Sequence, residues 1–256
     1  RVLIMKYRKN NESINKYTAG LLDADGNIHL TVTDSQTSSN IRSVRVQFTG
    51  ERKDKVVETL LNLHDHYQMG RMEYPNTRTN IVNWTLNGQE AINFLTVIKK
   101  HLVIKGQHAE RTINLWYRLK DRTSTVKALA RWRRLSRDST GPIHHKKHLT
   151  WAWLAGYIDG DGHISIPKKR IELQSNLRDI AAYELIQHSL GRPYRINYKP
   201  SIQQDIIRID LSFTKEHTAF MKGTGVKILR HLRMKRWALE QVFAAHNKQL
   251  KPTSRD

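Results

Sequence analysis

The feature that most constrains this chain is an internal repeat. Two nine-residue segments match at five positions in one register, Thr18-Ala-Gly-Leu-Leu-Asp-Ala-Asp-Gly26 and Leu154-Ala-Gly-Tyr-Ile-Asp-Gly-Asp-Gly162. The second copy begins 154 − 18 = 136 residues after the first, about half of the 256-residue chain. A repeat at this distance predicts two structural units of similar design.

The sequence around each copy repeats as well. Each copy follows helix-compatible sequence and precedes alternating apolar side chains, a period that indicates strands with one buried face. These apolar positions are Ile28, Leu30, Val32, Val44, Val46 and Phe48 in the first half, and Ile164, Ile166, Ile171 and Leu173 in the second.

Further elements are expected in the same order in both halves. In the first half they are a helix at 52–65, strands at 70–74 and 80–86, and helices at 88–99 and 106–119. In the second half they are a helix at 177–190, strands at 194–199 and 205–212, and helices at 214–222 and 232–247. Each half therefore reads αββαββα with one further helix, which predicts an α+β fold of two pseudo-symmetric units with antiparallel sheets.

Composition restricts the partners of such a fold. The 44 Lys and Arg residues against 23 Asp and Glu give a formal net charge of +21, which favours DNA, RNA or another polyanion. The content of hydrophobic residues, 38%, is too high for a disordered basic tail. The absence of cysteine excludes disulfides, thiolate zinc sites and cysteine nucleophiles. The apolar runs are far shorter than the roughly 20 residues of a membrane helix, so no membrane partner is expected.

A basic bridge separates the halves. Residues 118–148 contain ten Lys or Arg and two Asp, a net of 10 − 2 = +8. Trp132 lies among arginines there, so the bridge is interpreted as a nucleic-acid-facing linker, with anchoring of Trp132 to the core as the alternative. The cluster His144-His145-Lys-Lys-His148 is interpreted as phosphate-facing rather than metal-binding, since it lacks neighbouring Cys or acids. We place the units at 1–120 and 149–256, with the linker at 121–148.

The repeated motif itself predicts a close helix pair. Gly20 and Ala24 lie four residues apart on one helix face, as do Gly156 and Gly160. Glycine costs a helix about 1 kcal/mol relative to alanine, and a close approach of two helix backbones would offset that cost.

This packing predicts that two acidic residues lie close together. If the repeated helices lie side by side, Asp25 and Asp161 meet at their C-terminal ends, where the helix dipoles add negative charge. Unless one carboxyl group is protonated, cations must occupy the gap. Carboxylate and backbone oxygens favour a hard ion such as Mg²⁺, and such ions between two acids beside a basic surface are typical of phosphodiester hydrolysis.

The two motifs and the order of elements resemble the LAGLIDADG homing endonucleases of the two-motif, single-chain type, over about 12–248. The resemblance implies that the motif helices join two subdomains whose sheets form a saddle in the DNA major groove. It implies that Asp25 and Asp161 are catalytic acids that bind metal, with the backbone carbonyls of Ala24 and Gly160 as further ligands. Asp23 and Asp159, two residues earlier, are expected to have structural roles.

The resemblance also implies an activity. The chain would act as a monomer that cuts both strands of a long, partly asymmetric DNA site, leaves short 3′ overhangs and promotes intron mobility. Mg²⁺ is the expected cofactor; Mn²⁺ would substitute for it, and Ca²⁺ would bind without supporting cleavage. The compartment would be a chloroplast, a mitochondrion or a prokaryotic cytoplasm, following the host intron.

The family uses a basic residue before the last helix of each half. The shared pattern His-Leu-X-apolar-Lys at 101–105 and 231–235 assigns this catalytic role to Lys105 and Lys235, which would stabilise charge in the transition state or position solvent. A family position that often holds Gln is not assigned, although Gln47 and Gln174 lie nearby.

The strand residues between the apolar positions are predicted to face outward and read DNA, because their side chains can pair with base edges. In the first half these DNA-binding candidates are Asn27, His29, Thr31, Thr33, Ser43, Arg45, Gln47, Arg71, Glu73, Asn83 and Thr85. In the second half they are Ser165, Lys169, Arg170, Glu172, Gln174, Arg195, Asn197, Lys199, Arg208 and Asp210. The segment 34–40 is predicted to be a loop that becomes ordered on DNA.

Two other activities fit the same scaffold. One is an RNA maturase that assists group I intron splicing, with intron RNA as the partner. The other is a non-catalytic DNA-binding regulator, against which the retention of both Asp and both Lys residues argues.

Overall fold

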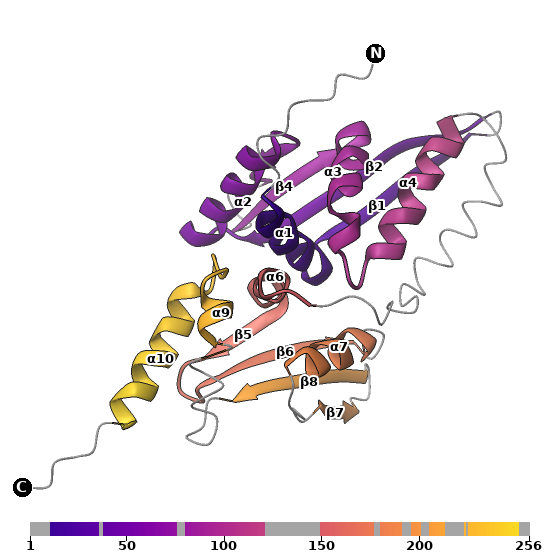
Figure 1. Ribbon diagram of the computed structural model, residues 1–256. Helices are drawn as coiled ribbons and strands as arrows, with labels where there is room; N and C mark the ends of the chain where they lie inside the picture. Colours follow the sequence, from indigo (N-terminus) through magenta and orange to yellow (C-terminus); the bar gives the residue numbers. More distant parts are fainter. Residues whose placement is uncertain are drawn as a thin grey trace, which may run out of the picture.

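Two similar halves meet along a central helix pair. The computed structural model describes residues 11–35, 38–75, 80–120, 149–176, 180–190, 196–200, 205–212, 223 and 225–250. Helix α1 (Glu12–Ala24) of the first half and helix α6 (Trp151–Asp161) of the second lie side by side between the two sheets (Figure 1). These helices are the two copies of the repeated motif, so the close pairing predicted from the glycines is confirmed.

The first half is a four-stranded antiparallel sheet with helices over one face (Figure 1). The strand order is β1-β2-β4-β3. After α1 the elements are β1 (Asn27–Ser35), β2 (Ser38–Glu51), α2 (Asp54–Tyr67), β3 (Arg71–Glu73), β4 (Ile81–Asn87), α3 (Gly88–Ile98), η1 (Lys99–His101) and α4 (Gly106–Lys120).

The second half repeats this topology. Its sheet has the order β5-β6-β8-β7, the same arrangement of first, second, fourth and third strands. After α6 its elements are β5 (Gly162–Ser165), β6 (Arg170–Asn176), α7 (Ile180–Leu190), β7 (Ile196–Pro200), β8 (Asp205–Ser212), α9 (Val226–Leu229) and α10 (Arg236–Leu250). The α+β fold of two pseudo-symmetric units is therefore confirmed. Among the helices of the described ranges, none combines the length and apolar character needed to cross a bilayer.

Several local expectations differ from the structure or lie outside it. The predicted loop 34–40 is wrong at both ends, because β1 runs to Ser35 and β2 begins at Ser38, with Asp34 opposite Ser39 and Ser35 opposite Ser38; residues 36 and 37 lie outside the described part of the chain. The register shifts by one residue between Thr31 and Val32, and beyond the pair of Val32 with Ile41 the ladder contains only polar residues, so no apolar alternation marks it in the sequence. The helix expected at 214–222 and the linker at 121–148 lie outside the described residues, so the unit boundaries stay predictions.

The helix pair can form because Gly20 and Gly156 have no Cβ atom. A Cβ built on Gly20 would lie 1.9 Å from the carbonyl oxygen of Trp153, and one on Gly156 would lie 2.0 Å from that of Tyr17. Neither distance is possible for a real Cβ, so each helix rests its glycine directly on the backbone of the other. The two contacts are related by the repeat, since 156 − 20 and 153 − 17 both equal 136.

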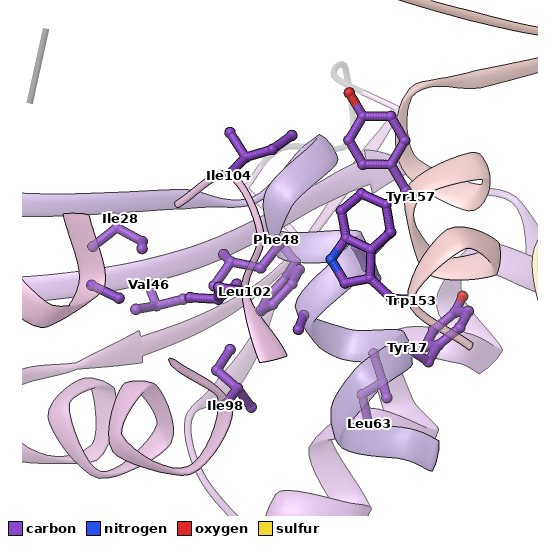
Figure 2. Packing of buried hydrophobic residues seen from close by; sticks show 14 of the residues in the cluster. Tyr17, Ile28, Val46, Phe48, Leu63, Ile98, Leu102, Ile104, Trp153 and Tyr157 are labelled. Atoms are coloured by element: carbon purple, nitrogen blue, oxygen red, sulfur yellow. The ribbon is translucent and has the colours of Figure 1, made fainter. Parts of the chain in front are cut away.

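The core of the first half extends into this interface. Trp84, Phe48 and Phe94 form an aromatic cluster under the sheet, with Phe48 and Trp84 stacked at 5.0 Å between ring centroids. Figure 2 shows Trp153 directed from α6 toward Phe48 and Leu102 of the first half. One continuous hydrophobic core therefore spans both halves, which holds the ends of α1 and α6 at a fixed separation.

Substitution of either interface glycine tests this packing. Gly20→Ala or Gly156→Ala places a methyl group against a carbonyl of the partner helix, so we expect a loss of about 3 kcal/mol or more in the free energy of unfolding. Gly223→Ala is the control, because a Cβ there meets no atom within 4 Å. Urea unfolding followed by circular dichroism measures both; equal stability of all three variants would contradict the proposed backbone contact.

Candidate functional site

An acidic centre lies where the two motif helices end. Asp25 directly follows α1 and is exposed, whereas Asp161 is the last residue of α6 and is partly buried. Burial and the nearby charge of Asp25 raise the pKa of Asp161 to about 7, although Lys105 and Lys235 act in the opposite direction. The predicted meeting of the two carboxyl groups is thus present, and they repel each other when both are ionised.

Two lysines cap the same helix ends. The Nζ of Lys105 donates to the carbonyl oxygens of Leu22, Ala24 and Gly26 at 2.8, 3.1 and 2.8 Å. Each ammonium group lies at the negative end of a helix dipole, where a cation is stabilised.

Lys235 repeats this arrangement in the second half. Its Nζ donates to the carbonyl oxygens of Ile158, Gly160 and Gly162 at 2.9, 2.9 and 2.6 Å. Burial lowers the pKa of Lys235, against the opposing charges of Asp159, Asp25 and Asp161. The His-Leu-X-apolar-Lys pattern therefore brings both lysines to the acidic centre, while their catalytic role stays a prediction.

The earlier acid of each motif holds the loop that carries the lysine. Asp23 accepts hydrogen bonds from the backbone N–H of Val103 at 2.7 Å and of Lys105 at 2.7 Å. Burial raises the pKa of Asp23, and these hydrogen bonds oppose that shift by stabilising the carboxylate. Asp23 thus fixes the backbone from which the Lys105 side chain reaches the end of α1.

Asp159 does the same in the second half. It accepts hydrogen bonds from the backbone N–H of Arg233, Met234 and Lys235 at 2.8, 3.1 and 2.8 Å. The structural role expected for Asp23 and Asp159 agrees with these contacts.

Each of these acids is also bound by an aromatic side chain of the opposite half. Trp153 Nε1 on α6 donates to Asp23 Oδ2 at 2.9 Å, and the Tyr17 hydroxyl on α1 donates to Asp159 Oδ2 at 2.7 Å. Both pairs follow the repeat, because 153 − 17 and 159 − 23 both equal 136. The sequence interpretation missed these residues, since Tyr and Trp are not identical; the available signal was that both positions hold aromatic hydrogen-bond donors.

The donor set of the centre fits a divalent cation. Asp25 and Asp161 lie close enough to interact, and within the described ranges no group of three or more His, Asp or Glu side chains that could hold a metal ion comes together. A divalent ion between Asp25 and Asp161 would relieve the repulsion that raises the pKa of Asp161. The carbonyl oxygens of Ala24 and Gly160 each accept one hydrogen bond from a lysine, which leaves a second lone pair for an ion.

A cavity of about 640 Å³ opens beside the centre. Asp25, Gly160 and Lys235 line one side, and Phe48 and Trp237 lie among its apolar lining residues. A reacting group and its solvent could therefore reach Asp25 and Lys235 from this cavity.

Many predicted DNA-reading residues of the first half lie on the open sheet face. Strand pairing places Asn27 opposite Gln47 and His29 opposite Arg45, on the face away from the apolar core. The exposed side chains of this set are Asn27, His29, Arg45 and Arg71, and the partly buried ones are Ser43, Gln47 and Glu73. The backbones of Thr31 and Thr33 lie on β1, whereas their side chains are outside the described part of the structure.

Asn83 and Thr85 correct that prediction. Both lie on β4, in the middle of the sheet, with exposed fractions of only 7% and 0%. Thr85 pairs with Gln47 on one side and Arg71 on the other, and its hydroxyl donates to Glu73 Oε2 at 3.0 Å. Alternation therefore predicted the face of the sheet on which these two side chains lie but not their burial.

The second half is described for part of its predicted set. Ser165, Arg170 and Glu172 are partly buried on β5 and β6. Lys169 lies in the turn before β6, with a left-handed φ of 48°. The remaining predictions fall on described backbone without described side chains, at Gln174, Asn197, Lys199, Arg208 and Asp210, or outside the described residues, at Arg195.

His163 was missed on this face. It is exposed on β5 opposite Glu172, and it corresponds to Asn27 by the repeat offset of 163 − 27 = 136. Comparison of the two halves position by position would have found it.

Carboxylates on the open faces hold neighbouring arginines. Arg71 Nε donates to Glu73 Oε1 at 2.6 Å, and Arg170 Nε contacts Glu172 Oε1 in the same i, i+2 arrangement. Arg45 Nε donates to Asn87 Oδ1 at 3.2 Å. Glu73 and Glu172 thus orient arginines, a role that differs from direct pairing with a base edge.

The similarity of this chain to known proteins lies in its fold. No family model and no curated protein sequence matches the chain. The LAGLIDADG homing endonuclease I-LtrWI bound to target DNA is 15% identical with a TM-score of 0.71, over 94% of this chain and 92% of that chain. The LAGLIDADG meganuclease I-AabMI bound to uncleaved DNA is 14% identical with a TM-score of 0.64, over 92% and 91%. I-SmaMI bound to uncleaved DNA with calcium ions is 12% identical with a TM-score of 0.63, over 93% and 94%. The chain has the fold of the single-chain LAGLIDADG homing endonucleases.

The raised pKa of Asp161 predicts a pH dependence of stability. Asp161 has a folded-state pKa raised from 3.8 to about 7. Its contribution to the free energy of unfolding is therefore greatest at low pH and is lost as the pH rises through about 7. The free energy of unfolding of the wild type minus that of Asp161→Asn should fall between pH 5 and pH 8, and Mg²⁺ should restore it at pH 8. Histidine titrations cancel in the difference; a difference that rises with pH would contradict the repulsion.

Proposed function

We propose that this chain is a site-specific DNA endonuclease that hydrolyses one phosphodiester bond in each strand of a long duplex target. The observation that carries the proposal is the convergence of four charged residues between the two four-stranded sheets, at the ends of α1 and α6. These residues are Asp25, Asp161, Lys105 and Lys235. The basic charge of +21 and the fold shared with nucleases solved on DNA support the same partner. The asymmetric side chains of the two open faces favour a target that is only partly palindromic.

Asp25 and Asp161, with the carbonyl oxygens of Ala24 and Gly160, would hold Mg²⁺ at this centre. When bound, Mg²⁺ neutralises charge on the phosphodiester and lowers the pKa of coordinated water. Mn²⁺ would substitute for it, and Ca²⁺ would bind without supporting cleavage. The calcium-containing DNA complex of I-SmaMI is consistent with divalent ions in proteins of this fold.

The lysines contribute positive charge that is held in place before substrate arrives. Three carbonyl oxygens orient each ammonium group, so Lys105 and Lys235 can stabilise the developing charge on a phosphate without reorganising. The backbone N–H bonds to Asp23 and Asp159 keep each lysine loop against its helix end. We infer that one acid and one lysine serve each strand, with short 3′ overhangs as the product and intron mobility as the biological outcome.

Selection for cleavage tests the proposed activity. A randomised duplex library is incubated with the chain in Mg²⁺ or in Ca²⁺, and the cut ends are sequenced. We expect one long site, cut in Mg²⁺ alone, with short 3′ overhangs. Intact DNA in Mg²⁺ would contradict the nuclease, and binding without cutting would favour the regulator; binding of intron RNA in its place would favour the maturase.

Substitution of the motif acids tests the assignment of the centre. Asp25→Asn and Asp161→Asn each remove a negative ligand, so each should abolish double-strand cutting of the selected site, with a loss of about 100-fold or more. Supercoiled plasmid carrying the site separates nicked from linear product. Asp65→Asn on α2 is the control, since that exposed acid lies away from the centre. Full linearisation of the plasmid by either motif variant would contradict the assignment of Asp25 and Asp161 as the acids of the cleavage centre.

The held arginines predict base preferences. Because Glu73 orients Arg71 through Nε, the two Nη groups are predicted to donate to a guanine. Arg71→Ala should therefore relax the preference at one target position, by about 1–3 kcal/mol, and Glu73→Gln should weaken it partially. Arg236→Ala on α10 is the control, expected to leave every base preference intact. Competition binding to single-base variants of the site measures this; an unchanged profile for Arg71→Ala would refute the role.

A further inference from the structure

We propose that Tyr17 and Trp153 are positioning residues that act across the interface, each holding the lysine of the opposite half in place. Tyr17 on α1 would position Lys235 through Asp159, and Trp153 on α6 would position Lys105 through Asp23. The inference rests on the proposed nuclease function. It means that the site for each strand cut depends on an aromatic side chain of the opposite half.

The contacts of Asp159 carry the first half of the argument. Asp159 is 4% exposed, and its carboxylate accepts hydrogen bonds from the Tyr17 hydroxyl and from the backbone N–H groups of 233–235. Loss of the hydroxyl leaves a buried carboxylate short of one charge-assisted hydrogen bond. The carboxylate and the loop bound to it would then shift toward solvent, and Lys235 stands at the end of that loop.

Trp153 occupies the equivalent place for the first half. Asp23 is 3% exposed, and its Oδ2 accepts from both Trp153 Nε1 and the backbone N–H of Val103. Its Oδ1 accepts from the N–H of Lys105, so the carboxylate connects the indole directly to the lysine backbone. Loss of the indole N–H would therefore loosen Lys105 while leaving the bonds around Lys235 in place.

The aromatic rings themselves pack independently of these donors. The Tyr17 ring lies under the Arg233 guanidinium at 5.1 Å, and Trp153 stacks on Tyr157 with 5.1 Å between centroids. Phenylalanine keeps a ring at either position, so Tyr17→Phe removes the hydroxyl alone, whereas Trp153→Phe removes the indole N–H together with some buried volume of the core. Tyr17→Phe is the cleaner of the two because the volume hardly changes.

Opposite strand bias is the expected signature. On an end-labelled target duplex in Mg²⁺, Tyr17→Phe should slow cutting of one strand roughly tenfold relative to the other, and Trp153→Phe should slow the other strand. Tyr67→Phe is the matched control, since Tyr67 is a buried tyrosine whose hydroxyl donates to Asn15 within the first half, at 2.8 Å. It should lose similar stability without strand bias. Equal slowing of both strands by Tyr17→Phe and by Trp153→Phe would overturn the inference.

Chemical labelling separates this inference from the nuclease proposal. Acetic anhydride followed by peptide mass spectrometry reports the accessibility of each lysine amine in the full chain without DNA. Tyr17→Phe should raise acetylation at Lys235 severalfold and leave Lys105 unchanged, and Trp153→Phe should do the reverse. This pattern in a chain that cuts no DNA would uphold the positioning and refute the nuclease, whereas unchanged labelling would refute the positioning. Thermal unfolding of each variant, compared with that of Tyr67→Phe, verifies that the variants are folded. If one variant does not fold, acetylation of the lysine assigned to the other variant still tests the proposal.

Discussion

The backbone contact between α1 and α6 is the interaction on which the rest of the structure depends. Gly20 rests on the carbonyl of Trp153 and Gly156 on that of Tyr17, at distances that exclude any side chain. This approach fixes the crossing of the helices, and the crossing places their C-terminal ends together. The approach of Asp25 to Asp161 follows from that geometry, and it also brings together the two helix ends that Lys105 and Lys235 cap, each within its own half.

The same geometry creates an electrostatic problem that the chain solves with its own cations. Two helix C-termini and the carboxyl groups of Asp25 and Asp161 concentrate negative charge in one place. Lys105 and Lys235 cap the helix ends through three carbonyl oxygens each, so the dipoles are compensated by the protein itself. What remains is the mutual repulsion of the two carboxyl groups, which a proton or a divalent ion relieves. The helix dipoles are therefore compensated without a bound ion, and a cation between the two acids would relieve the remaining repulsion.

The repeat made much of the fold predictable. The order of elements, the helix pairing and the approach of Asp25 to Asp161 follow from local patterns that occur twice, and each copy supports the reading of the other. The lysine loops were found for the same reason, because His101 and His231 begin matching segments. The assignment failed where the outcome depends on neighbours distant in sequence. Asn83 and Thr85 alternate correctly but are buried on the strand between β2 and β3, and no pattern within β4 reveals that. Tyr17 and Trp153 differ in type, and their partners lie in the opposite half, so only the assembled interface shows their function.

The central claim is that the interface of the two halves creates one metal centre shared between Asp25 and Asp161. Anomalous diffraction at the manganese edge, from crystals of the chain with its duplex target and Mn²⁺, tests it directly. The account predicts anomalous peaks in contact with both motif carboxylates, at the ends of α1 and α6, that disappear in Asp161→Asn or lose that contact. Manganese bound elsewhere, with no peak between these carboxylates, would contradict the account.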